Sequence, residues 1–363
     1  MNLITEQTTK IKATLPKGDP NKKQEVFYNP LMKSNRNISI LLINSIKNKK
    51  MNFVFPLAGS GVRALRFLKE LKQGKISTLH VNDLKENFPT TFKENLKLNN
   101  LNTNKVLIHN QDAELLLLTQ HQGGFGVYFD YIDLDPFGTP NPFLASAVNK
   151  IKRNGILAIT ATDTAALTGT YPKVTKRKYW ATSLKNYIMH ETGLRILIRK
   201  VQLQGIQFDK ALIPILAYHK DHYFRLYFLS EKGKEKCDQL LKQHQYFLFN
   251  PKTLEFKTSN YNQESGFQFA GPLWTGKLIN KPLITKMVKN NPFPEEQKFL
   301  ETLKEESKID ITGFYDLHVL SKKLKQDPKK RDILKKIKAS PTHFSPTGFK
   351  TKKSIKEIIK ILK

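Results

Sequence analysis

The sequence predicts an α/β fold with a parallel, doubly wound sheet, followed by a second, basic α+β domain. Short apolar runs alternate with segments of helical spacing through the first part of the chain, and this alternation is typical of parallel sheets covered by helices on both faces. Two β-rich runs then meet at residues 220–222, as in an antiparallel hairpin that closes the sheet. Beyond residue 230, polar loops with scattered aromatics and lysine-rich helical stretches replace the alternation. We therefore expect two functional domains, residues 1–230 and residues 231–363.

Each expected strand is an apolar run, and each of the first four is followed by a segment with helical spacing. After the first run, for example, Val62, Leu65 and Leu68 lie three residues apart. Ligands of such sheets bind outside the carboxyl ends of the strands, so the residues after each strand are the first candidates for a site. The expected strands are 53–57, 76–84, 105–109, 126–135, 155–163, 211–220 and 222–230, and the expected helices are 61–71, 88–101, 113–118 and 141–151.

The charge of the chain predicts a polyanionic partner. Lysine and arginine outnumber aspartate and glutamate by 61 to 31, so the formal net charge is +30. Repulsion between so many like charges lowers the stability of the fold. Binding to nucleic acid is the leading explanation for why the chain retains this charge. An anionic membrane surface or a generally basic proteome is the alternative. The segment 321–363 is the most basic, and its lysines favour phosphate contacts, which supply affinity without sequence specificity. The alternative for this segment is a solvated, lysine-rich pair of helices.

Cysteine content and hydropathy exclude several classes. Cys237 is the only cysteine, so neither a disulfide framework nor a cysteine-based zinc site can form. The first 20 residues are polar and contain no signal-peptide core. No apolar run reaches the about 18 residues of a membrane span. We expect a cytoplasmic monomer that binds no metal and no membrane.

Two glycines and an acid indicate a nucleoside site at the ends of the first two strands. Gly59 and Gly61 lie in the first strand-to-helix turn, where glycine lets a ligand approach the backbone. Ala64 holds the last position of the dinucleotide-binding pattern, so this turn alone fits an ordinary tight turn equally well. Asp83 ends the next strand, and an acid about 20 residues after the glycines binds a ribose in such sites. The alternative for Asp83 is a cap on the following helix.

A third strand end adds Asp112 and Ala113. The Asp112 carboxylate suits the exocyclic amine of adenine, and the small Ala113 side chain admits the ring. Asp112 is equally suited to be a helix N-cap. Three successive strand ends with suitable groups favour the cofactor interpretation.

The fourth strand ends in DPFG, residues 135–138. The lone pair of an exocyclic amine on a base is delocalised into the ring, so the amine is a poor nucleophile. A carboxylate (Asp135) and a carbonyl held rigid by proline (Pro136) can accept its hydrogens, and the aromatic Phe137 can stack on the base. A Rossmann dehydrogenase has no need of this tetrapeptide, so the pattern favours methylation of an exocyclic amine.

These motifs resemble those of the tRNA (guanine(26)-N2)-dimethyltransferases, the Trm1 family, and most closely its archaeal branch. The resemblance covers nearly the whole chain and implies a class I (Rossmann-like) fold. It also implies that S-adenosyl-L-methionine donates two methyl groups, one after the other, to N2 of a tRNA guanine. The matching segments are 25–40, 58–67, 81–83, 133–140, 160–181, 190–198, 220–227, 271–278 and 342–351.

The resemblance implies a role for each candidate residue. Asp135 would accept a hydrogen bond from the guanine amine, and Phe27 and Phe137 would hold the flipped base between them. Arg36, with Arg66 as a similar candidate and Arg63 as a weaker one, would contact the methionine part of the cofactor. The remaining cofactor residues would be Gly59, Gly61, Asp83 for the ribose, and Asp112 with Ala113 for the adenine.

Basic residues after the fifth strand are candidates for tRNA contact. Lys173 and Arg177 lie in a segment expected to be a loop on the active-site side, and Asp163 is a second-tier candidate near the amine. The chain departs from many relatives at Phe55 and Pro56, where they carry an acid, and at Glu114, where they carry an asparagine. Two rival functions stay open: an amino-methyltransferase acting on adenine N6 or cytosine N4 of RNA or DNA, and a non-catalytic RNA-binding protein.

Overall fold

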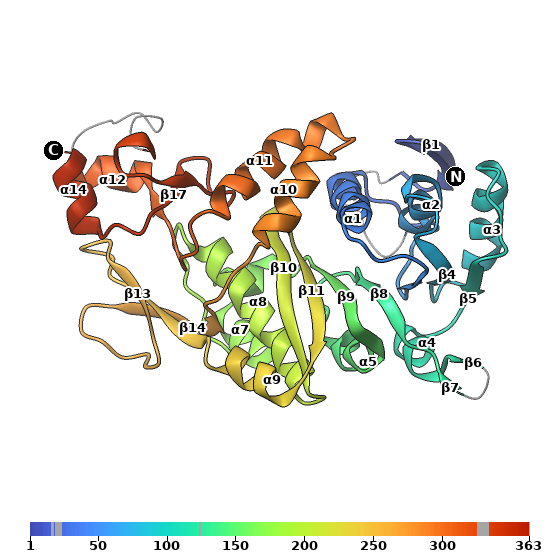
Figure 1. The fold of residues 1–363 in the computed structure, drawn as a ribbon, viewed down its shortest axis with the longest axis horizontal. Helices are drawn as coiled ribbons and strands as arrows, with labels where there is room; N and C mark the ends of the chain where they lie inside the picture. Colours follow the sequence, from blue (N-terminus) through green and yellow to red (C-terminus); the bar gives the residue numbers. More distant parts are fainter. Residues whose placement is uncertain (16–17, 19–23, 123–124, 325–333, 363) are drawn as a thin grey trace. The chain divides into compact units, whose positions relative to one another are not determined.

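The structure is a computed structural model that describes residues 1–15, 18, 24–122, 125–324 and 334–362 (Figure 1). It separates into two compact units. Unit 1 contains Met1–Ala161, Tyr227–Ser230 and Lys289–Glu296, and unit 2 contains the rest of the described chain. The functional boundary near residue 230 stays a prediction, because compactness does not assign a role to either part. The units are described separately.

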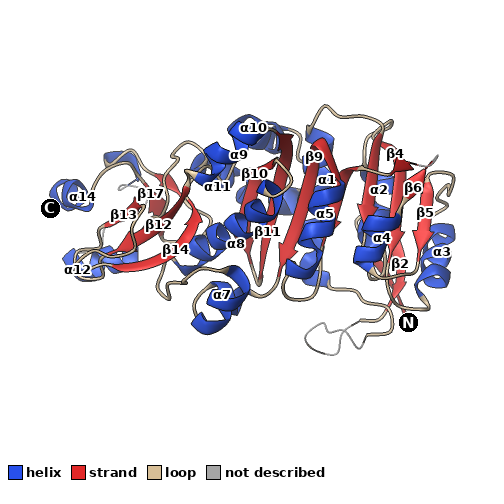
Figure 2. Ribbon diagram, turned by 90° about the horizontal axis from the view of Figure 1, so that it is seen from below, coloured by secondary structure: helices blue, strands red, loops and turns tan. Residues whose placement is uncertain are grey.

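Unit 1 is built on a parallel sheet, as the sequence predicts. Strands β5, β4, β3, β8 and β9 pair in that order, every pair parallel, and β11 follows β9. Helices α1, α2, α4 and α5 lie beside these strands in Figure 2. The strands are β3 (Met51–Phe55), β4 (Ile76–Asn82), β5 (Val106–His109), β8 (Phe129–Leu134), β9 (Ile151–Ala161) and β11 (Tyr223–Lys232, of which Tyr227–Ser230 belong to unit 1). The helices are η1 (Pro30–Met32), α1 (Lys33–Ser45), α2 (Val62–Glu70), α3 (Phe88–Leu98), α4 (Ala113–Thr119), η2 (Asn141–Phe143), α5 (Leu144–Lys150) and η3 (Pro294–Glu296).

The direction of winding reverses at β3. The chain moves from β3 through β4 to β5 on one side and places β8 and β9 on the other. The carboxyl ends of β3 and β8 are therefore neighbours, and this reversal point is where open α/β sheets bind their ligands. Beneath it the core is aromatic: Phe67 of α2 packs on Phe53 and Phe55 of β3 with ring centroids 5.8 and 5.1 Å apart.

Several elements of unit 1 differ from the predicted ones. The antiparallel hairpin of β1 (Asn2–Glu6) and β2 (Thr9–Ala13) and helix α1 are not among the predicted elements. Strand β9 starts at Ile151, four residues earlier than predicted, because Ile151 already pairs with Phe129. Two short strands, β6 (His121–Gln122) and β7 (Phe125–Gly126), also pair before β8.

Unit 2 begins with helices where a loop is predicted. Residues 173–178 belong to α7, which starts at Pro172 and ends with basic residues; proline at the first helical position and cations in the last turn both stabilise a helix. The predicted hairpin is present as β10 and β11, neighbours in one sheet that are joined by two residues. The helices are α6 (Thr164–Leu167), α7 (Pro172–Tyr179), α8 (Met189–Ile206), α9 (Lys234–Leu241), α10 (Lys281–Lys289), α11 (Gln297–Glu306), α12 (Leu317–Leu324) and α14 (Ile355–Leu362). The strands are β10 (Lys210–Lys220), β12 (His244–Phe249), β13 (Phe256–Ser259), β14 (Gln268–Trp274), β15 (Tyr315–Asp316), β16 (Ser340–Pro341) and β17 (Gly348–Lys350).

A buried ionic network joins distant segments of unit 2. Glu191 of α8 is fully buried and accepts hydrogen bonds from Arg195 Nε (2.9 Å) and Lys350 Nζ (2.8 Å). Glu306 of α11 lies 3.6 Å from the same lysine and bonds to His343 Nδ1 at 2.6 Å. Buried carboxylates are tolerated only with such partners. Glu191 and Arg195 of segment 190–198, and His343 and Lys350 of segment 342–351, are therefore parts of the scaffold.

Candidate active site

The turn after β3 is held to the carboxyl end of β4 by hydrogen bonds, one of them from the Ala58 N–H to the Asn82 carbonyl at 2.8 Å. Gly59 and Gly61 have φ of +59° and +73°, values that favour glycine. The Gly59 N–H donates to Asp83 Oδ2 at 2.7 Å. A Cβ on Gly61 would lie 2.2 Å from the Phe92 ring. Gly61 is therefore required by packing against α3 as well as by the turn.

Asp83 keeps acceptor capacity despite its role in this turn. One carboxylate oxygen accepts from Gly59 and the other from the Lys85 N–H at 3.1 Å. Each carboxylate oxygen offers about two acceptor positions, and the Asp83 side chain is half-buried. The end of β4 thus presents an oriented carboxylate that can still accept hydrogen bonds from the hydroxyl groups of a ribose.

Asp112 is the N-cap of α4. Its Oδ1 accepts from the Glu114 and Leu115 N–H groups at 2.9 and 3.0 Å, while the residue remains exposed. The capping interpretation is therefore correct, and it uses only one of the two oxygens. Ala113 follows as a buried residue on the first turn of α4.

Asn82 links the ends of three strands and is not among the predicted site residues. Its Nδ2 donates to the carbonyl oxygens of Pro56 and Gln111, both at 2.9 Å, and its Oδ1 accepts from the Gln111 N–H at 3.0 Å. The side chain is fully buried. Asparagine suits this position because it donates and accepts at once. In the sequence, the one feature that could have indicated this role is the position of Asn82 just before Asp83, at the end of an apolar run.

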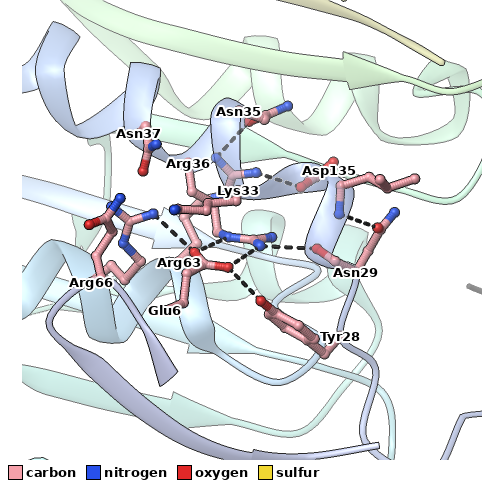
Figure 3. A network of polar contacts seen from close by, with 12 residues as sticks. Glu6, Tyr28, Asn29, Lys33, Asn35, Arg36, Asn37, Arg63, Arg66 and Asp135 are labelled. Atoms are coloured by element: carbon pink, nitrogen blue, oxygen red, sulfur yellow. Dashed lines mark hydrogen bonds and ion pairs between the residues drawn. The ribbon is translucent and has the colours of Figure 1, made fainter. Parts of the chain in front are cut away.

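Asp135 lies at the end of β8, beside the glycine turn. Its side chain is 25% exposed, and its Oδ2 accepts from Arg63 Nη2 at 2.6 Å (Figure 3). Oδ1 has no hydrogen bond among the described residues. Pro136 is buried directly after it. One oxygen is thus fixed, and the other is left for an incoming donor.

Asp133 lies deeper than Asp135. Its Oδ2 accepts from Tyr131 Oη at 2.6 Å and lies 3.6 Å from Arg63 Nη1, and its side chain is 1% exposed. The two acids share one arginine but differ in access to solvent. Only Asp135 can meet a ligand.

Arg36 and Arg66 converge on Glu6 of the N-terminal hairpin (Figure 3). Nε and Nη2 of Arg36 both donate to the Glu6 carboxylate, and Arg66 Nη1 donates to Glu6 Oε1 at 3.0 Å. Arg66 also forms two bonds to Glu70, at 2.8 and 2.7 Å, and is fully buried. Burial raises the pKa of Glu6, but the two guanidinium groups outweigh it and lower the pKa to about 2. A cofactor carboxylate would have to share these arginines with Glu6.

Phe27 and Phe137 are brought together, in edge-to-face contact. Their ring centroids lie 4.5 Å apart with an interplanar angle of 73°. A base stacked between two rings needs roughly twice the stacking distance of an aromatic pair, so the two rings must separate to accept one. Phe137 is 43% exposed, which leaves it room to rotate.

The remaining candidates belong to unit 2. Lys173 and Arg177 are exposed on α7. Asp163 precedes α6, and its Oδ2 accepts from Tyr179 Oη and Lys178 Nζ, both at 3.2 Å. Asp163 is thus a helix-anchoring residue of unit 2. Among the described residues, no group of three or more His, Cys, Asp or Glu is placed to hold a metal ion, and no helix is long and apolar enough to cross a membrane.

Comparisons with known proteins agree over the full length of the chain. A family model described as N2,N2-dimethylguanosine tRNA methyltransferase matches residues 4–363. A tRNA (guanine(26)-N(2)/guanine(27)-N(2))-dimethyltransferase of Aquifex aeolicus is 38% identical over 99% of this chain and 95% of its own length. A tRNA (guanine(26)-N(2))-dimethyltransferase of Pyrococcus furiosus is 36% identical over 100% of this chain and 99% of its own. The solved structure of Trm1 from Pyrococcus horikoshii in complex with S-adenosyl-L-methionine is similar with a TM-score of 0.87 and 32% identity, and covers 99% of both chains.

Proposed function

Because the chain belongs to the N2,N2-dimethylguanosine tRNA methyltransferase family, we propose that it transfers two methyl groups from S-adenosyl-L-methionine to N2 of guanine 26 in tRNA. The predicted family and the predicted class I methyltransferase fold are both confirmed. The observation that carries the proposal is Asp135: a partly exposed carboxylate at the reversal point of the sheet, with one oxygen fixed by Arg63 and the other without a hydrogen bond among the described residues.

The residues around the glycine turn fit the cofactor by their chemistry. Asp83 offers acceptors for the ribose hydroxyl groups, and Asp112 Oδ2, the oxygen not used in capping, suits the adenine amine. The Gly59 turn and the buried Ala113 complete the adenosine side, and Arg36 and Arg66 are the candidates for the methionine carboxylate. When bound, S-adenosyl-L-methionine supplies an electrophilic methyl group on a positively charged sulfur.

The chain's own residues act on the acceptor. Asp135 Oδ1 and the Pro136 carbonyl accept hydrogen bonds from the guanine amine, which turns its lone pair away from the ring and towards the donor. Once the new N–C bond has formed, the nitrogen is cationic and strongly acidic. Its proton passes to the Asp135 carboxylate or to water, and general-base catalysis of this kind contributes about 10²- to 10⁴-fold.

Admission of the base requires rearrangement of the aromatic pair. Phe27 and Phe137 separate, and their faces stack on the guanine after it leaves the tRNA helix. Flipping costs a few kcal/mol, which stacking and pocket contacts offset. Lys173, Arg177 and residues 231–363 contact the tRNA backbone, in line with the net charge of +30. We further propose that the enzyme acts in the cytoplasm, as a monomer and without a metal.

The test is nucleoside analysis of two tRNA transcripts that differ only at position 26. With labelled cofactor, we expect N2,N2-dimethylguanosine from the transcript with guanine and none from the transcript with adenine. Methylated adenine or cytosine in either transcript would support a rival amino-methyltransferase, and absence of any product would support a non-catalytic RNA-binding protein.

Replacement of the acceptor carboxylate tests the assigned chemistry. Asp135→Asn should lower kcat by about 10²- to 10⁴-fold while tRNA and cofactor binding persist. The measurement is single-turnover methylation beside calorimetric cofactor binding. Turnover near the wild-type value, with tRNA bound normally, would refute the role of Asp135.

A further inference from the structure

We propose that Arg63 is a positioning residue for methyl transfer: it fixes the Asp135 carboxylate so that Oδ1 faces the amine of the bound base. The inference rests on the proposed function. It assigns Arg63, a weaker cofactor candidate in the sequence, to the acceptor side of the site.

The guanidinium of Arg63 works as a bridge with two separate ends. Nη2 donates to Asp135 Oδ2 at 2.6 Å. Nη1 donates to Asn35 Oδ1 and Ser39 Oγ, both at 2.9 Å. Through Arg63 the acceptor carboxylate is thereby connected to Asn35 and Ser39 of helix α1 (Figure 3).

The far end of the bridge is itself held. Asn35 Nδ2 lies 3.3 Å from Thr160 Oγ1 of β9, and Ser39 Oγ donates to the Asn35 carbonyl at 2.8 Å. Tyr227 Oη lies 2.8 Å from Ser39 Oγ. All these partners are buried. These contacts restrict the orientation of the Arg63 guanidinium, and its hydrogen bond to Oδ2 in turn restricts the Asp135 carboxylate.

Charge adds a second reason for an arginine here. Asp133 and Asp135 approach the same guanidinium, at 3.6 Å from Nη1 and 2.6 Å from Nη2. The Arg63 side chain is only 8% exposed, so its charge is poorly screened. A lysine supplies one point charge and cannot span both ends, whereas the planar fork of arginine can.

The geometry divides the two oxygens of Asp135 between two tasks. Oδ2 accepts from Arg63, so rotation of the carboxylate is restricted, and Oδ1 has no hydrogen bond among the described residues. Misplacement of a reacting group by about 1 Å can cost about 10²-fold in rate. We therefore expect the effect of Arg63 on kcat and not on cofactor affinity.

A double-mutant cycle tests this coupling in the full-length protein with guanine-26 transcript. Arg63→Met should lower kcat by about 10²-fold and leave the KM for S-adenosyl-L-methionine within about 2-fold. In the Asp135→Asn background the same change should lower kcat by less than about 3-fold, because interacting residues are non-additive. Single-turnover assays with excess enzyme keep the slow variants measurable.

A matched control removes a buried arginine elsewhere. Arg195 is 1% exposed and paired with Glu191 in unit 2. The fold-change caused by Arg195→Met should be the same in the wild-type and Asp135→Asn backgrounds, since Arg195 and Asp135 belong to different hydrogen-bond networks and independent changes add. Thermal unfolding of every variant reports whether it is folded.

Two further measurements keep the proposal falsifiable if Arg63→Met does not fold. Asn35→Ala keeps both charges but removes one of the two hydrogen-bond acceptors of Nη1, and it should lower kcat several-fold only when Asp135 is present. Guanidinium ion added to Arg63→Ala should restore part of the lost kcat and should not help Arg195→Ala.

The outcomes separate the inference from the function on which it rests. If the wild-type chain makes no dimethylguanosine, the proposed function fails and the inference with it. If the wild type is active, an unchanged kcat in Arg63→Met, an equal loss in both Asp135 backgrounds, or a loss confined to the KM for the cofactor overturns the role of Arg63 alone.

Discussion

Glu6 is a buried carboxylate shared by two arginines and a tyrosine. It accepts from Arg36, Arg66 and Tyr28 Oη, the last at 2.8 Å. Burial and the Glu6 charge raise the pKa of Tyr28 to about 12. Removing one partner of a buried ion pair costs far more than removing a surface pair. Glu6 therefore holds the N-terminal hairpin and the two cofactor candidates together.

The pKa of Glu6 predicts how stability depends on pH. It is about 2 in the folded chain against 4.5 ordinarily, so this contribution is present above pH 4.5 and is lost as pH falls towards 2. Its size is on the order of 3 kcal/mol. Urea unfolding at several pH values should show this loss in the wild type and a weaker one in Glu6→Gln. If the free energy of unfolding changed with pH equally in the two proteins, Glu6 would not be the source of this pH dependence.

Phe137 provides a second test at this scale. Phe137→Ala removes a face that would stack on the guanine, and base–aromatic stacking is worth about 1–3 kcal/mol per base. We expect kcat/KM for tRNA to fall by about 5- to 150-fold with unchanged cofactor affinity, measured by steady-state methylation. Phe137→Leu, which keeps volume without the π-face, is the matched control and should recover little activity. Full recovery would show that packing alone matters.

Single residues mark the limit of sequence-based prediction. Asp135 stands in a recognisable tetrapeptide, so its place at a strand end was predictable. Arg63 was only a weak candidate, because its role depends on Asn35 and Ser39, which reach it only in the folded chain. The sequence likewise suggests that Gly61 binds a ligand, whereas in the structure Phe92 of α3 occupies the space that a side chain at Gly61 would need.

At the scale of elements, α7 combines exposed cations with exposed aromatic residues at both ends. Lys173 and Arg177 lie on its surface, between Tyr171 and Trp180. Basic grooves that also offer aromatic rings are typical of sites that bind nucleic acid strands. This arrangement supports the proposed contact between α7 and tRNA.

A charge reversal on α7 tests that contact. Lys173→Glu with Arg177→Glu should raise the KM for tRNA and reduce the steepness of its salt dependence by about 0.7–0.9 per lost phosphate contact. Cofactor affinity should not change. The control Lys47→Glu with Lys49→Glu makes the same change in total charge at two exposed positions of unit 1, outside residues 231–363. An equal loss in the control would assign the effect to net charge and not to α7.

Periodicity predicted the elements of the parallel sheet and missed those outside it. Strands β3, β4, β5, β8 and β9 contain apolar runs whose strand type is set locally. The β1–β2 hairpin is instead stabilised by contacts made after folding, such as Asn95 Oδ1 accepting from the Lys12 N–H at 2.7 Å. Helix α7 was expected as a loop because its apolar residues are few, and its start at Pro172 carried the helical signal.

At the scale of the whole molecule, the Glu191 network predicts where unit 2 is vulnerable. Lys350→Met leaves Glu191 and Glu306 without their shared cation, and breaking a buried pair costs about 3–5 kcal/mol. We expect a clear fall in the thermal midpoint, measured by calorimetry. The surface change Lys352→Met, two residues further on and exposed, should leave the midpoint within about 1 °C. Similar midpoints for the two variants would contradict this account.

Charge and composition were informative at this scale, whereas the arrangement of the chain was not. The net charge of +30 predicts a polyanionic partner independently of any motif. The composition of unit 2 could not reveal that Tyr227–Ser230 and Lys289–Glu296 return to unit 1, because such returns depend on contacts between residues far apart in sequence.

The contact between Phe27 and Phe137 sets an energetic threshold that every incoming base must meet. An aromatic pair of this kind is worth about 0.5–1.5 kcal/mol, and opening it disfavours all bases equally. It therefore cannot select guanine over adenine. Opening the pair weakens the binding of a free nucleoside as much as that of a base attached to tRNA. Only the tRNA gains compensating binding energy from contacts elsewhere on the protein. The closed rings thus select for attachment to a large substrate, and the identity of the base is left to the amine acceptors at Asp135.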